Sequence, residues 1–188
     1  MKDKATEYLN RAVCKDVSRP SIQPIARRAN DRVATDGHRL HREDGLPTAT
    51  PSLSNGGDFN NYPNVDVVIG KLPPIQSTCY GKVSKSQLKD VKALCKLDRD
   101  RLPCEFIFEG EKLVIKSGTS LKNIKFEYEF PDFKSDGEAN VVLDLRYFVD
   151  AIFEAEKLFS IEFRGEGHAV VIKNVMNLEA YVMPCSRQ

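Results

Sequence analysis

Four lysines in one predicted helix form the clearest charged pattern in this sequence. Their spacing is four, three and four residues: Lys85, Lys89, Lys92 and Lys96. At about 100° per residue, this spacing places all four on one narrow stripe of an α-helix. Like charges that close repel one another, and a polyanion would relieve the repulsion. The alternative is an ordinary solvated face, because lysine is the usual surface residue of helices.

Any nucleic-acid contact made by this stripe is predicted to be insensitive to base sequence. No aromatic residue interleaves the four lysines, and no glycine-rich phosphate loop occurs in the chain. Contacts to phosphates position a protein on duplex DNA without reading its bases. The helix predicted after Asp144 mixes Arg146 with Asp150, Glu154 and Glu156, so it would make a poorer phosphate surface.

The sequence gives no support to catalytic or metal chemistry. Asp36 and His38 are two residues apart and His41 is close by, but a metal site needs three or four convergent ligands. His168, the remaining histidine, falls in a predicted hairpin without an acidic partner at a suitable spacing. We therefore expect no catalytic residues, no metal, no cofactor and no enzymatic activity. Gly37 is better explained as a backbone position that needs an unusual dihedral angle.

Length and composition describe a globular protein rather than a disordered one. The 188 residues are 41% hydrophobic and 29% charged, enough for one ordinary domain plus a fragment of another. The net charge of +1 means that a DNA-binding surface would require charges gathered on one face. No apolar run is long enough to cross a bilayer and no signal peptide is recognisable, so we expect a cytoplasmic protein without membrane contact. The odd number of five cysteines at irregular spacings indicates reduced, mostly buried thiols.

The first third of the chain is predicted to hold one helix and a few short extended segments. Apolar residues at helical spacing indicate a helix over 3–15, ended before Pro20. Extended segments are expected at 21–27 and 32–35. From residue 41 to 61 the sequence is rich in Pro, Thr, Ser, Asn and Gly, which indicates a linker or long mobile loop. Val65–Ile69 then reads as a strand.

Beyond about residue 77 the sequence repeats a βαβββ pattern. A capping box, Ser84 with Gln87, begins one helix, and Asp144 begins a second about 60 residues later. A strand is expected before each helix, at 79–83 and 140–143, and three after it. These three strands are expected at 106–116 (two strands of a hairpin) and 124–130 in the first copy, and at 161–167, 170–173 and 178–183 in the second. The alternation in 124–130 predicts one buried and one wet sheet face, and hence an α+β fold with helices on one face of antiparallel sheets.

Four short motifs resemble the bacterial DNA polymerase III β subunit, or DNA sliding clamp, family. The segment Val33–Leu40 matches the V-A-T-D-G-H-R-L motif of the family's middle domain over eight consecutive residues. The motifs occur in the family's order: Ala12–Asp16 with Ser18–Pro20, Val33–Leu40, Tyr62–Asn64 with Val67–Ile69, and Tyr181–Pro184. The resemblance implies a DNA-clamp fold built from tandem βαβββ repeats. It divides the chain into a truncated middle-domain-like segment (1–45), a loop or linker (46–61) and a complete last-domain-like domain (62–188).

The resemblance also implies a function. A clamp-like processivity factor would hold duplex DNA without sequence preference and tether DNA polymerase and other replication or repair proteins, with a clamp loader as a further partner. Because the matched chain is short, a closed homo-oligomer is expected, with a tetramer ahead of a trimer or dimer. The alternative is a non-encircling adaptor or decoy that binds clamp-interacting peptides. Sedimentation would separate the two hypotheses.

By position, the resemblance further implies a peptide-binding pocket. Its expected lining is Thr35, Gly37, His38, Arg39, Leu40, Pro63, Val68, Tyr181, Val182, Met183 and Pro184. A shallow groove of Leu, Val, Met and Pro suits the apolar anchors of an extended peptide. The double substitution Leu40→Ala with Met183→Ala is expected to abolish peptide binding without disturbing the fold. The alternative is that 181–183 is only a last strand packed in the core.

Overall fold

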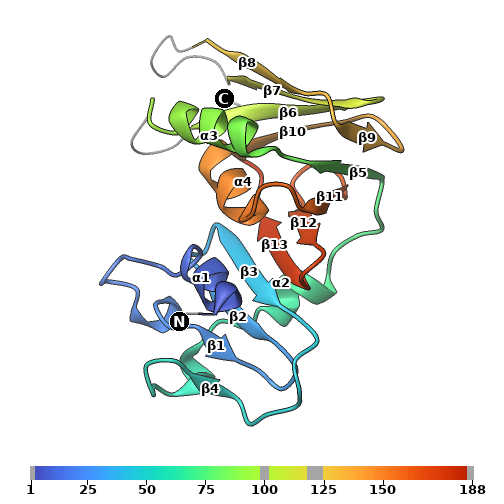
Figure 1. The fold of residues 1–188 in the computed structure, drawn as a ribbon. Helices are drawn as coiled ribbons and strands as arrows, with labels where there is room; N and C mark the ends of the chain where they lie inside the picture. Colours follow the sequence, from blue (N-terminus) through green and yellow to red (C-terminus); the bar gives the residue numbers. More distant parts are fainter. Residues whose placement is uncertain (1–2, 98–101, 118–124, 186–188) are drawn as a thin grey trace.

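The computed structural model describes residues 3–97, 102–117 and 125–185 (Figure 1). Within these ranges, short helices connect two antiparallel sheets. The α-helices are α1 (Lys4–Asn10), α2 (Asp66–Gly70), α3 (Lys85–Leu94) and α4 (Leu145–Ile152), and the 3-10 helices are η1 (Pro20–Ile22) and η2 (Phe59–Asn61). None of the helices in the described ranges is long and apolar enough to cross a membrane.

A nine-stranded sheet and a four-stranded sheet make up the β structure. The first has the order β4-β1-β2-β3-β13-β12-β11-β5-β9, and the second has the order β10-β6-β7-β8. The strands of the large sheet are β1 (Ala26–Arg27), β2 (Arg32–Thr35), β3 (Arg39–Glu43), β4 (Ser52–Leu53), β5 (Ser77–Lys82), β9 (Phe133–Ser135), β11 (Leu158–Phe163), β12 (Val170–Asn174) and β13 (Leu178–Val182). Those of the small sheet are β6 (Pro103–Glu109), β7 (Lys112–Ser117), β8 (Glu127–Phe130) and β10 (Ala139–Asp144).

The two predicted βαβββ repeats are present, and they exchange their first strands. In sequence, β5 precedes α3 and β10 precedes α4. However, β5 pairs with β11 of the second repeat, whereas β10 pairs with β6 of the first repeat. Each repeat therefore supplies one strand to the other repeat's sheet, which ties the two into one unit. The α+β class with antiparallel sheets is confirmed.

The N-terminal segment forms a third αβββ unit with the same strand order. Helix α1 leads into β1, β2 and β3, and β4 pairs with β1 as β10 pairs with β6. Thus the order β4-β1-β2-β3 repeats the order β10-β6-β7-β8. The segment expected to be a free linker over 46–61 contains β4, so part of it is paired into the sheet. The predicted division into domains is not tested by this pairing.

The last strands of two units join the N-terminal unit to the rest of the molecule. Strand β3 pairs with β13 in an antiparallel register that places Leu40 opposite Tyr181. Figure 1 shows α1 and β1–β3 below α4 and β11–β13, with the small sheet at the top. The main core lies between the sheets and the helices, and its largest fully buried side chains include Tyr8, Phe106, Phe133 and Phe148.

In the N-terminal third, two expectations need correction and one strand was missed. The helix expected over 3–15 ends at Asn10, where Ala12 N–H turns back to Leu9 O. Of the extended segment expected at 21–27, only β1 is a strand, and η1 lies before it. Strand β3 was not expected, because Arg39–Glu43 is rich in charge. Its central residues Leu40 and His41 are both buried, one on each face of the sheet.

The segment Val65–Ile69, expected to be a strand, is instead part of a helical turn that includes α2. Asn64 accepts a hydrogen bond from the Asp66 N–H at 3.1 Å, which begins the turn. Val65 is buried and Ile69 is partly buried against the same cluster, whereas Val67 and Val68 are exposed. Burial four residues apart is the helical period. A short apolar run cannot reveal this from sequence alone.

In the second half, the expected strands lie close to their predicted positions. Strand β8 begins at Glu127, and residue 124, the expected start, lies outside the described residues. Strand β9, which pairs with β5, was not expected. All five cysteines lie in the described ranges and none forms a disulfide there; Cys14, Cys79 and Cys104 are buried and the other two are half-buried.

Candidate functional site

The lysine stripe lies on a well-formed helix. The Ser84 hydroxyl accepts from Gln87 N–H at 3.2 Å and the Gln87 side chain accepts from Ser84 N–H at 2.7 Å, which is the predicted capping box. Leu88 and Val91 are the buried side of α3 and hold it against the main core. On another side of the helix, all four lysines are exposed: Lys85, Lys89, Lys92 and Lys96.

Within the described part of the chain, no ion pair neutralises these four lysines. The nearby acids have other partners. Glu156 accepts the backbone N–H of Lys85 at 3.0 Å, and Asp90 accepts the hydroxyl of Tyr128 at 3.2 Å. The stripe is therefore a concentrated cationic surface on a chain whose net charge is only +1.

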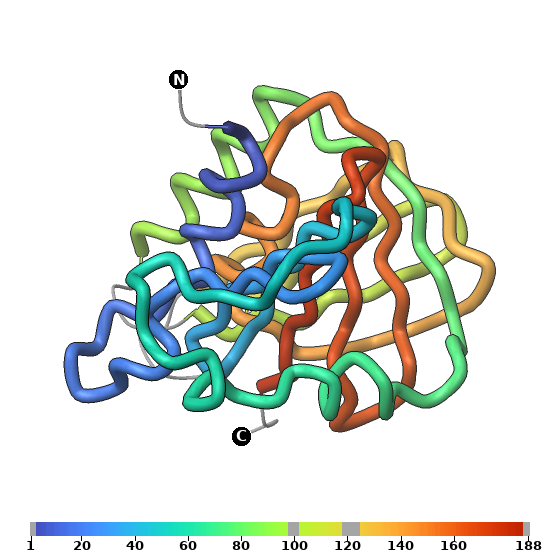
Figure 2. The backbone as a smooth tube through the Cα atoms, turned by 90° about the horizontal axis from the view of Figure 1, so that it is seen from below, coloured from blue at the N-terminus to red at the C-terminus, as the bar shows by residue number. Residues whose placement is uncertain are grey.

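Unlike the α3 lysines, the basic residues Lys4 of α1 and Arg11, which follows α1, have acidic partners. Lys4 Nζ lies 2.6 Å from Glu154, and Arg11 lies 3.7 Å from Asp150 and 3.6 Å from Glu7. The charges of these basic side chains are thus balanced by nearby carboxylates. In Figure 2, α1, α3 and α4 lie on the same side of the strands. The α3 stripe therefore adds a cationic surface to this helical side of the molecule.

The turn between β2 and β3 is fixed by its own side chains. Thr35 Oγ1 donates to Arg39 O at 2.6 Å and accepts from Gly37 N–H at 3.0 Å. Asp36 Oδ1 accepts from the N–H groups of His38 and Arg39 at 3.0 and 3.1 Å. The predicted pocket segment is therefore a rigid turn rather than a free loop.

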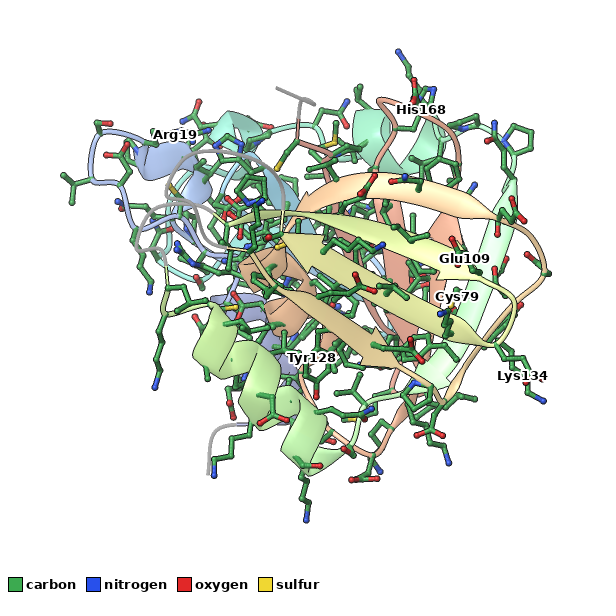
Figure 3. All side chains as sticks on the ribbon, turned by 90° about the horizontal axis from the view of Figure 1, so that it is seen from above. Arg19, Cys79, Glu109, Tyr128, Lys134 and His168 are labelled. Carbon is green, nitrogen blue, oxygen red and sulfur yellow. The ribbon has the colours of Figure 1, made fainter. Side chains whose placement is uncertain are left out.

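Gly37 has the unusual dihedral that the sequence predicts, with φ of +90°. A Cβ added there would lie 2.5 Å from the Arg19 guanidinium, which donates to Asp36 O at 2.9 Å. Figure 3 labels Arg19 near the margin of the molecule. The positive φ favours glycine at this position, and a side chain there would also displace the Arg19 guanidinium.

Arg39 is a structural centre rather than an open pocket wall. Its guanidinium contacts Asp36 at 3.1 Å and Asp150 at 2.5 Å, and donates to Arg11 O. It also lies 4.5 Å above the ring of Tyr147. The contact to Asp36 lies within the turn, and the others join β3 to α4 and to the residue that follows α1, so little of the side chain remains for a ligand.

Leu40 and Tyr181 form the buried floor of the predicted pocket region. They are opposite each other on β3 and β13 and belong to one apolar cluster with Val33, Tyr62 and Val65. Leu40 is only 3% exposed. Leu40→Ala is therefore expected to lower stability by about 2–5 kcal/mol as well as to affect peptide binding, because it removes a buried leucine.

The exposed residues of the predicted pocket are Gly37, His38, Pro63, Val68 and Met183. His38 and Met183 are joined by a hydrogen bond from Met183 N–H to His38 O at 3.1 Å, and both side chains are exposed. Pro63, which follows η2, and Val68 of α2 are exposed on the segment that covers Leu40 and Tyr181. Val182 is fully buried in the main core on the other face of the sheet, as the alternative interpretation expected.

Pro184 borders a cavity of about 300 Å³ next to this region. Its lining residues are Asn140, Val141, Val142, Phe163, Glu166, Gly167, Pro184 and Cys185. The N–H of Cys185 donates to Val142 O at 2.8 Å, which holds the C-terminal segment along β10.

Tyr147 belongs to the region but was missed by sequence reasoning. Its ring is stacked 6.5 Å from that of His38 and lies beneath Arg39. The signal for it was weak, since Tyr147 falls between the apolar positions of α4 and more than 100 residues from His38.

Among the described residues, no cluster of three potential metal ligands occurs. His41 is fully buried, with Nδ1 2.9 Å from Tyr8 O.

Comparison with known proteins places this geometry in a known fold. No protein-family model matches the chain, and no curated protein matches it. Solved structures do match, over 97–99% of the chain. DNA polymerase III subunit beta from Borrelia burgdorferi, in complex with a natural product, has a TM-score of 0.73 and 18% identity. Caulobacter crescentus pol III beta has a TM-score of 0.78 and 12% identity.

A third match is the Pseudomonas aeruginosa sliding clamp bound to griselimycin, with a TM-score of 0.74, 12% identity and 97% of this chain covered. The chain spans 62–63% of the length of these three relatives. It therefore has the fold of the bacterial DNA polymerase III β sliding clamps, in a shorter form.

Proposed function

We propose that this chain is a clamp-like module that holds duplex DNA without sequence preference and binds peptides of polymerases and other replication or repair proteins. The observation that supports DNA binding is the α3 stripe, where four exposed lysines have no ion pair within the described ranges. The clamp-like fold provides the frame, and the absence of an interleaved aromatic residue favours contacts to phosphates.

Duplex binding is tested by its salt dependence. Each phosphate contact that a substitution removes should reduce the log–log salt slope by about 0.9. The variant carrying alanine at positions 85, 89, 92 and 96 should bind a duplex oligonucleotide more weakly and with a flatter slope. As a control, Lys112→Ala with Lys116→Ala removes two lysines that are paired with glutamates on the small sheet, at 3.3 and 3.5 Å. Equal affinities and slopes for all variants would show that the stripe is ordinary surface.

Peptide binding is supported by the exposed rim around a rigid turn. His38 and Met183 are exposed beside the buried Leu40 and Tyr181, and Val68 lies on the covering segment. An extended peptide with apolar anchors could use the thioether of Met183, which adapts to irregular shapes. Tethering a polymerase through such a peptide would raise its local concentration on DNA.

Topological tethering would require a closed assembly. The chain carries three αβββ units, counted over its described residues. If a closed ring needs twelve such units, as in the resembled family, four chains would supply them. We therefore propose a homotetramer, joined at sheet edges. Sedimentation at several concentrations tests this, and a concentration-independent monomer would instead favour the adaptor or decoy function.

A further inference from the structure

The β5 and β9 end of the large sheet carries an exposed apolar and basic surface, on the face that points away from the main core. Cys79 and Phe159 point into the main core, so alternation directs Tyr80 and Leu158 to the opposite face. Tyr80 is 49% exposed and Leu158 is 45% exposed. They lie on adjacent strands, because Tyr80 pairs with Ser160, two residues from Leu158.

Two lysines flank these side chains. Lys134 pairs with Tyr80, and Lys82 pairs with Leu158. Both lysines are exposed, and neither has an ion pair among the described residues. Figure 3 shows Lys134 extending outward from the margin of the molecule. We call Tyr80, Lys82, Lys134 and Leu158 the Tyr80 surface.

We propose that the Tyr80 surface binds single-stranded nucleic acid. An exposed tyrosine on an open sheet offers its ring to an unpaired base, and neighbouring lysines can contact the phosphates on either side. The two lysines are about 5 Å apart across the strands and about 7 Å apart along them. Long lysine side chains at that separation can reach phosphates of one strand, and Leu158 adds apolar contact for a base or sugar.

This ligand fits the surface better than a duplex does. In duplex nucleic acid the faces of the bases are stacked on one another and are not available to Tyr80. The α3 stripe, in contrast, lacks an aromatic residue and suits phosphates alone. Since the two surfaces lie on different elements, the inference does not depend on the proposed binding of duplex DNA.

The test is fluorescence anisotropy with fluorescein-labelled oligo(dU) and oligo(U) of equal length and the full chain at low salt. We expect saturable binding that Tyr80→Ala weakens about tenfold and Tyr80→Phe preserves, because stacking needs the ring and not the hydroxyl. Lys82→Ala with Lys134→Ala should flatten the log–log salt slope by about 1.4, or about 0.7 per contact on a single strand. Comparison of the two oligonucleotides identifies the preferred sugar.

A second readout and a matched control make the result specific. The chain has six tyrosines and no tryptophan, so stacking on Tyr80 should quench part of its tyrosine fluorescence, and Tyr80→Phe should remove that part. As the control, Lys112→Ala with Lys116→Ala removes two lysines that are paired with glutamates on the small sheet, and it should leave oligonucleotide binding unchanged. The proposal is overturned if neither oligonucleotide binds saturably, or if Tyr80→Ala binds both as tightly as the wild type.

Discussion

The Arg39 guanidinium lies 2.5 Å from the Asp150 carboxylate, and this ion pair connects the rigid turn of the predicted peptide pocket to α4. The same guanidinium donates to Arg11 O on the segment that follows α1 and lies over Tyr147. A residue that sequence comparison assigns to a pocket wall thus joins the N-terminal unit to the rest of the fold.

Replacing Arg39 should therefore reduce stability. Arg39→Met leaves Asp150 without its closest partner and removes the contact to Tyr147, at an expected cost of about 3 kcal/mol. Urea unfolding followed by circular dichroism measures it. The control is Lys4→Met, which breaks the exposed pair with Glu154 and should cost less than about 1 kcal/mol. Equal losses in the two variants would contradict the role assigned to Arg39.

Asp31 should be a second point of high sensitivity. Its side chain is 3% exposed and lies 2.7 Å from both Arg28 and Arg42. Asp31→Ala would leave two partly buried guanidinium groups without this carboxylate, which should cost about 3–5 kcal/mol in the unfolding free energy. Asp44 also lies 2.7 Å from Arg42 but is 43% exposed, so Asp44→Ala should cost less than about 1 kcal/mol. A loss for Asp31→Ala no larger than for Asp44→Ala would refute this ranking.

His41 should make the fold sensitive to acid. Burial, together with the charges of Arg39 and Arg11, lowers its pKa to about 3. Because this is below the unfolded value of about 6.5, its stabilising contribution is complete above pH 6.5 and declines as the pH falls from 6.5 towards 3. Between pH 7 and pH 5 the wild type should lose about 2 kcal/mol through this group. His41→Gln cannot titrate, so its unfolding free energy should change less over that range; parallel pH profiles would disprove the assignment.

Met183 offers a cleaner test of peptide binding than Leu40 does. Met183 is 41% exposed, so Met183→Ala should leave the melting temperature nearly unchanged while weakening a Gln- and Leu-containing clamp-binding peptide by about tenfold. Fluorescence anisotropy measures the affinity. Val175→Ala, another exposed apolar residue in the turn after β12, serves as the control and should not affect binding. If the wild type shows no saturable peptide binding, the pocket assignment is wrong.

The periodic parts of the fold could be predicted from sequence. The capping box at Ser84 and the apolar face of α4 are local signals, and they defined both helices of the repeat. The alternating strands after each helix defined the βαβββ pattern. Gly37 was also predictable, because a positive φ is a local requirement that glycine satisfies.

Tertiary structure decided the parts that lack a local signal. Strand β3 is stable because β2 and β13 pair with it on either side, not because its charged sequence favours a strand. The helical turn at Val65–Ile69 forms because Val65 and Ile69, four residues apart, pack against the same apolar cluster. The exchange of β5 and β10 between repeats, and the contacts that make Arg39 a structural centre, involve residues far apart in sequence. The spacing of residues along the chain specifies the type of secondary structure and the apolar face of each segment. Only packing in three dimensions determines which segments contact one another.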